Sequence, residues 1–116
     1  MSFAIFCTNT STTTMTVYKV EVASTVYEDI EDLKEFLRSV MSQEGAHRYI
    51  DVMNGEMMSL SVFADCFAES RMQTIRNIHP HARRMVSHNR KWIYVFHIEE
   101  DIVVIDRILK AKMITR

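Results

Sequence analysis

Residues that could bind a polyanion are concentrated in the C-terminal half of the chain. Residues 70–116 contain ten Lys or Arg and four acids, a net charge of +6, whereas residues 1–69 contain four Lys or Arg and eleven acids, a net charge of −7. Clustered cations raise the local potential and speed the encounter with anionic partners. The split therefore predicts either a basic surface for a polyanion or acidic partner, or simply acids on solvated helix faces and bases on strands.

The histidines are the candidate acid–base and metal-binding groups. His79 and His81 flank Pro80 and could face one metal, but no third ligand lies nearby in the sequence, so we expect surface histidines. Histidine titrates close to neutral pH, which makes His88 and His97 acid–base candidates. For His97 we expect an ordinary place on a sheet face. The sequence thus predicts no metal site and no cofactor.

The composition bounds the architecture that positions these groups. A chain of 116 residues with 47% hydrophobic side chains fits one globular domain. Residues 1–14 are Ser/Thr-rich after an apolar start and read as an accessory extension, which leaves 15–116 as the domain. No apolar run approaches the roughly 18 residues needed to cross a bilayer. Cys7 and Cys66 are too few for a disulfide framework, so we expect free thiols and a cytoplasmic protein.

The N-terminal half predicts one strand and two helices. Residues 16–22 alternate apolar and polar side chains, the pattern of a half-buried strand. Apolar residues then recur at helical spacing over about 25–42, and again over 46–60 after an interruption at Gly45. A short connection makes two such helices antiparallel neighbours. We expect residues 61–81 to form a broken helix and an irregular link.

The C-terminal half predicts three strands. Residues 83–88 form a short polar strand candidate, 92–98 a run of aromatic and β-branched residues, and 102–109 a strand apolar on both faces at its start. The last of these is expected in a central position of the sheet. The order of elements predicts an α+β domain with an N-terminal strand, a two-helix antiparallel hairpin and a three-stranded antiparallel sheet.

This order, together with several residues, resembles the RelE/ParE superfamily of toxins from type II toxin–antitoxin modules. The resemblance covers roughly residues 17–113. It is carried by Asp29-Ile30 with Leu33, by the segment 46–50 with Leu60, by 82–85, by 94–96, and by 102–105 with 107–110. The resemblance implies the fold given above and a role in plasmid stabilisation-like systems. It also implies that a cognate antitoxin neutralises the protein, in a toxin–antitoxin complex that could be a heterotetramer.

The superfamily has two functional branches, which the residues of this chain can help to separate. RelE-like members cut messenger RNA on the ribosome, and cleavage by a 2′-hydroxyl needs a base, cations and a proton source. Here those roles would fall to Arg83, Arg84, His88 and Lys110. RelE-like toxins often carry a His or Tyr near the C-terminus, and residues 107–116 contain neither. The resemblance is therefore closer to ParE-like toxins, which poison DNA gyrase.

The ParE-like interpretation implies a protein that binds its target without catalysis of its own. The expected target-binding residues are Arg84, Arg90, Lys91, Arg107, Lys110 and Lys112. The alternatives are the ribosome-dependent endoribonuclease and a non-catalytic module that binds nucleic acid or a protein partner on the same scaffold. An antitoxin that covers a basic sheet is expected to be acidic there.

Overall fold

A mixed four-stranded sheet forms the centre of the molecule. The computed structural model describes residues 17–114, with side chains up to residue 112. The sheet has the order β1-β4-β3-β2, with β1 parallel to β4 and the other neighbours antiparallel. The strands are β1 (Lys19–Val22), β2 (Arg83–Val86), β3 (Trp92–Glu99) and β4 (Ile102–Lys110). The α+β class and the central position of the last strand are confirmed, and the N-terminal strand joins the same sheet.

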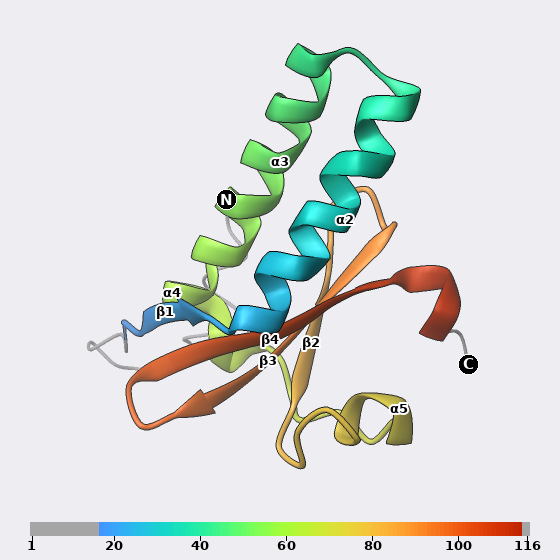
Figure 1. Cartoon of the computed structure of the whole chain (residues 1–116). Coiled ribbons are helices and arrows are strands. Elements are labelled where there is room, and N and C mark those ends of the chain that lie inside the picture. The colour runs from blue at the N-terminus through green and yellow to red at the C-terminus, as the bar shows by residue number, and fades with distance from the viewer. Residues whose placement is uncertain (1–16, 115–116) are drawn as a thin grey trace.

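Two long helices form the predicted antiparallel hairpin and lie across one face of the sheet (Figure 1). They are α2 (Ser24–Val40) and α3 (Gln43–Met58). The predicted break at Gly45 is wrong, because Gly45 lies in the first turn of α3. Ser42 caps that turn, since its Oγ accepts a hydrogen bond from the Gly45 N–H at 3.0 Å. No helix within residues 17–114 is long and apolar enough to span a bilayer.

The segment between α3 and β2 is the predicted broken helix and link. It contains α4 (Leu60–Phe63), the 3-10 turn η1 (Ala64–Cys66) and α5 (Gln73–Arg76). Figure 1 shows α5 below the sheet, away from the hairpin. Cys66 is disulfide-bonded, so the expectation of a free thiol is wrong for this residue. The expectation for Cys7, like the proposed extension 1–14, lies outside the described residues.

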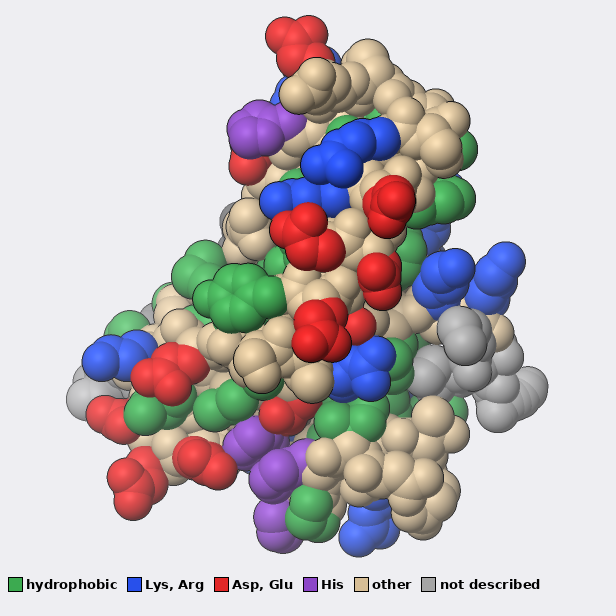
Figure 2. Space-filling view, in the orientation of Figure 1, with side chains coloured by type: hydrophobic (Ala, Val, Ile, Leu, Met, Phe, Trp, Pro, Cys, Tyr) green, Lys and Arg blue, Asp and Glu red, His purple; other side chains and the backbone are tan. Residues whose placement is uncertain are grey.

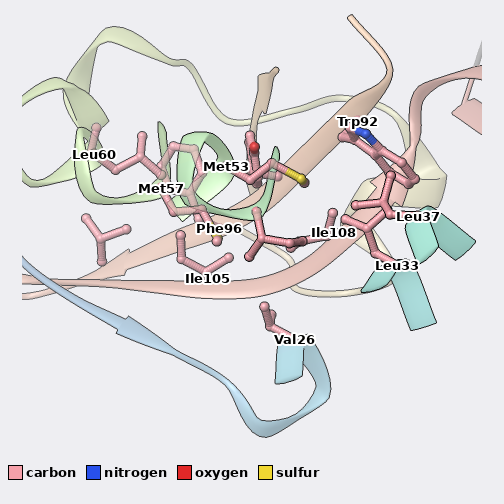
Figure 3. Packing of buried hydrophobic residues seen from close by; sticks show 14 of the residues in the cluster. Val26, Leu33, Leu37, Met53, Met57, Leu60, Trp92, Phe96, Ile105 and Ile108 are labelled. Carbon is pink, nitrogen blue, oxygen red and sulfur yellow. The ribbon is translucent and has the colours of Figure 1, made fainter. Parts of the chain in front are cut away.

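The main core lies between the hairpin and the sheet (Figure 3). Leu37 of α2 and Met57 of α3 are 2% and 1% exposed, and they belong to the same cluster as Tyr94 and Phe96 of β3. The aromatic side chains of β3 are thus core residues. Burying a large aliphatic side chain contributes about 1.5–3 kcal/mol, so the many buried side chains of this layer stabilise the fold strongly.

A second, smaller cluster covers the opposite face of β3. Ile93 and Val95 pack there against Ile75 of α5 and Ala82. Strand β3 is consequently buried on both faces from Trp92 to His97. This arrangement explains its nearly continuous apolar sequence.

Truncation of a core side chain on α2 tests this packing. We expect Leu37→Ala to lower the free energy of unfolding by about 2–5 kcal/mol, because the lost contacts leave a cavity. Val40→Ala on the same helix should change it by less than about 0.5 kcal/mol, because Val40 is 57% exposed. Urea unfolding followed by circular dichroism measures both. Equal effects of the two substitutions would contradict the observed orientation of α2.

Candidate functional site

The turn between β2 and β3 has a defined conformation that its own side chains support. Arg90 has a left-handed φ of 65°, and its N–H donates to the Ser87 carbonyl at 2.9 Å, which closes a tight turn. The Asn89 side-chain oxygen accepts hydrogen bonds from Ser87 Oγ at 2.7 Å and from the Lys91 N–H at 3.0 Å. The Trp92 N–H donates to Ser87 Oγ at 3.1 Å. The turn is therefore held in one conformation, and it carries the cations Arg90 and Lys91.

Two side chains of α3 fasten this turn to the helical hairpin. The Tyr49 hydroxyl accepts hydrogen bonds from Asn89 Nδ2 and from Trp92 Nε1, both at 2.9 Å. Glu56 accepts one from the His88 N–H at 2.9 Å and one from the Tyr94 hydroxyl at 2.5 Å. No local pattern in the sequence indicates this role of Tyr49 and Glu56, because their polar contacts join segments about 40 residues apart.

A groove of about 590 Å³ opens beside this turn. The C-terminal part of α2 supplies apolar walls, including Phe36 and Val40, which are 54% and 57% exposed. Tyr49 and Trp92 also line it. Four of the predicted target-binding cations stand around it, namely Arg90, Lys91, Lys110 and Lys112. The backbone brings them together, since Lys110 pairs with Trp92 and the Ala111 N–H donates to the Lys91 carbonyl at 2.9 Å.

Acidic and basic side chains are gathered in different parts of the surface. Figure 2 shows acidic side chains gathered over α2 and Lys or Arg side chains along the right-hand edge, near the C-terminal end. The basic groove thus borders an acidic helix face. A partner that binds in the groove must place its negative charges next to the groove's cations. It must keep negative charge away from the acidic, exposed face of α2.

The remaining predicted residues lie elsewhere. Arg84 is on the face of the sheet that carries Val95, where it borders a different hollow lined by residues 66–72. Arg83 donates from Nη1 to the Phe67 carbonyl at 2.8 Å. His88 is exposed in the β2–β3 turn, beside Glu56. The structure therefore does not bring Arg83, Arg84, His88 and Lys110 into one site.

Arg107 is held by an acidic residue of α2. Its Nε and Nη2 donate to the Asp29 carboxylate at 2.9 and 3.1 Å, and these hydrogen bonds raise the pKa of the guanidinium. Asp29 also accepts from the Ile108 N–H at 3.0 Å. The Asp29 carboxylate thereby pairs with the guanidinium of Arg107 and with a backbone N–H at the open edge of β4. Arg107 has a structural partner, whereas Arg90, Lys91 and Lys110 at the groove form no ion pair among residues 17–112.

Comparisons with known proteins give one clear finding. No family model matches the chain, and no curated protein matches it. A chain from the structure of the chromosomal ParDE TA system from P. aeruginosa superposes with a TM-score of 0.68, covering 81% of this chain and 96% of that one, at 13% identity. The two chains share a fold. The resemblance to ParE-like toxins is thus confirmed at the level of fold, and the identity is too low to carry activity over from the ParDE chain.

Removal of the Asp29 charge tests its double role. We expect Asp29→Asn to lower the free energy of unfolding by about 1–2 kcal/mol, since a charged hydrogen bond is weakened at a site that is only partly screened. The measurement is urea unfolding at neutral pH. Glu35→Gln is the control, because Glu35 is an exposed acid of the same helix. Stability losses of the same size in both variants would contradict the special role of Asp29.

The Tyr94–Glu56 contact predicts a change of stability at high pH. Burial, and then the hydrogen bond to Glu56, raise the pKa of Tyr94 above its ordinary value of 10.0. The folded state therefore keeps the phenolic proton more tightly, and this contribution is present below pH 10 and is lost as the pH rises above 10. Above pH 10 the wild type should lose up to about 1.4 kcal/mol per pH unit that Tyr94→Phe does not lose.

Urea unfolding at pH 9 and pH 11 measures this difference. Tyr94→Phe should have a lower free energy of unfolding than the wild type at pH 9. This difference should be smaller by about 1 kcal/mol at pH 11. Tyr27→Phe is the control, because Tyr27 is 62% exposed. A gap for Tyr94→Phe that stays constant between the two pH values would show that the phenol does not titrate with unfolding.

Proposed function

We propose that the chain is the toxin of a type II toxin–antitoxin system in the cytoplasm, and that its basic groove binds DNA gyrase. The observation that supports this most directly is the groove itself, where Arg90, Lys91, Lys110 and Lys112 surround apolar walls in a ParDE-like fold. An apolar wall with a charged rim is typical of protein–protein interfaces. The partner surface would be acidic at its rim and would insert an apolar side chain beside Phe36.

The same groove suits the cognate antitoxin. An acidic segment with apolar residues on one side would pair with the four cations and cover the exposed Phe36 and Val40. Neutralisation then follows from competition, because antitoxin and gyrase would need the same surface. A toxin–antitoxin heterotetramer is compatible with this arrangement, and the role in plasmid stabilisation is part of the same proposal.

The alternative of ribosome-dependent mRNA cleavage receives less support from the geometry. General acid–base catalysis needs its groups within hydrogen-bond reach of one reacting centre. Arg83 and Arg84 point to opposite faces of β2, as neighbours on a strand do, and Arg83 is bonded to the Phe67 carbonyl. His88 is separated from both by the end of the strand. A non-catalytic module on the same scaffold would bind through the groove without arresting growth.

A gyrase supercoiling assay with purified protein tests the proposal. We expect inhibition by the wild type and at least a tenfold loss of potency in the double variant Lys91→Glu/Lys110→Glu, because two rim attractions become repulsions. Arg76→Glu is the matched control, since Arg76 is an exposed cation of α5 and does not line the groove. It should inhibit like the wild type.

Other outcomes would decide against gyrase as the target. Normal supercoiling at a large excess of the protein would reject the proposal. Cleavage of a translated message that disappears in Arg84→Ala would establish the endoribonuclease instead. Salt-dependent binding to duplex DNA without growth arrest would favour the non-catalytic module.

A further inference from the structure

A group of polar side chains lies on the sheet face opposite the helical hairpin, apart from the groove. Its centre is His97 of β3, which is 5% exposed and is, with Ser87, one of two buried polar residues among residues 17–112. His79, His97 and Glu99 each offer one ligand atom, and these atoms lie within 4.8 Å of one another. Figure 2 shows histidine side chains beside acidic ones at the lower edge of the molecule.

A carboxylate behind His97 fixes the orientation of its ring. His97 Nδ1 lies 2.7 Å from Asp106 Oδ2, and the Asp106 side chain is only 15% exposed. Asp106 is the extra residue of a bulge, because Ile105 pairs with Phe96 and Arg107 pairs with Val95. A carboxylate that holds one ring nitrogen and leaves the other free is the usual outer partner of a metal-binding histidine.

The other nitrogen of His97 faces a second carboxylate. Nε2 lies 3.1 Å from Glu99 Oε2, and the His97 side chain is 7% exposed. If Nδ1 carries the proton that Asp106 accepts, Nε2 presents a lone pair to a negative oxygen. Two hydrogen-bond acceptors at this distance, His97 Nε2 and Glu99 Oε2, repel each other unless a cation lies between them. That cation is either a second proton on His97 or a metal ion.

His79 adds the third ligand from a different part of the chain. It lies between α5 and β2, and its ring stacks on His97 with centroids 3.7 Å apart and planes 5° apart. Its Nδ1 accepts a hydrogen bond from the His81 N–H at 3.0 Å. A neutral imidazole has one lone pair, so His79 would exchange this hydrogen bond for the metal.

We propose that His79, His97 and Glu99 bind a Zn²⁺ ion, with Asp106 as the outer partner of His97. Two imidazoles and one carboxylate are a donor set that Zn²⁺ accepts, with a fourth position left for water. Tetrahedral bonds of about 2.1 Å place ligand atoms about 3.4 Å apart. The His97–Glu99 separation of 3.1 Å is already close to that value. His79 must approach by up to about 1.4 Å, given the 4.8 Å span, and must turn out of its stacked orientation, because an imidazole binds a metal in the plane of its ring.

The position of the site defines what the ion does. His79 precedes Pro80 in the link that leads from α5 to β2, whereas His97 and Glu99 belong to β3. The ion would tie this link to the sheet, above the small apolar cluster of Ile75 and Val95. Zinc therefore stabilises the α5 side of the fold and leaves the groove on the other side unchanged. This inference does not depend on the proposed toxin function.

Zinc binding to tag-free, full-length protein tests the inference. We expect saturable binding of one Zn²⁺ per chain in equilibrium dialysis, and a rise in Tm of about 10 °C at a free zinc concentration 100 times the Kd. Co²⁺ in place of Zn²⁺ should give the intense visible bands of tetrahedral coordination. His79→Asn and Glu99→Gln should each weaken binding at least tenfold, and Asp106→Asn by 10–100-fold.

His81→Asn is the matched control, because His81 neighbours His79 but its side chain pairs with Glu69, and its backbone N–H is retained. It should bind zinc like the wild type. The variants at His79 and Glu99 alter ligands that are not fully buried, so circular dichroism should show them folded. The proposal is overturned if the wild type binds no stoichiometric zinc, or if His79→Asn binds as tightly as the wild type. Nitrogen NMR that shows both His97 nitrogens protonated in the presence of zinc would also overturn it.

Discussion

The hydrogen bonds that α2 makes to the outer edge of β4 are the interaction on which the rest of the fold depends. Strand β1 pairs only with Ile102–Ile105, so the edge of β4 beyond that point has no neighbouring strand. Thr25 Oγ1 donates to the Asp106 carbonyl at 2.9 Å, and Asp29 accepts from the Ile108 N–H. An edge left unpaired against the hairpin would cost about 1–3 kcal/mol for each buried polar group. The position of α2, and with it one wall of the groove, follows from this constraint.

The acidic first half and the basic second half of the sequence are partly explained by contacts between the two halves inside the fold. Acids of the first half accept hydrogen bonds from groups of the second half, as Asp29 does from Arg107 and Glu56 from Tyr94. These contacts join α2 and α3 to β3 and β4. Arg107 has its charge offset in this way, whereas Arg90, Lys91 and Lys110 at the groove form no ion pair with an acid among residues 17–112. A cationic surface therefore persists beside helices that are rich in acids.

Local pattern predicted the elements and failed where contacts between distant segments decide the outcome. The residue types typical of strands located the three C-terminal strands. Periodicity located both long helices, because one face of each helix must be apolar. It placed a break at Gly45, where the Ser42 cap starts α3 earlier. The cations at 90–91 and 110–112 were predicted as binding residues, and the structure brings them together. The stacking of His79 on His97 had no signal, because 18 residues and a change of direction separate them.

One bulge serves both faces of the sheet. Ile105 and Ile108 lie three residues apart in β4, yet both belong to the core under the hairpin. Strict alternation would send them to opposite faces, so the extra residue between the pairs at Val95 and Phe96 is required. The bulge lets Asp106 reach His97 on the face opposite the hairpin, while Arg107, which pairs with Val95 of that same face, reaches Asp29 of α2 at the outer edge of β4. A single inserted residue thus positions both the partner of the histidine cluster and the anchor of the helical hairpin. The two sites are consequently fixed relative to each other by the backbone of β4.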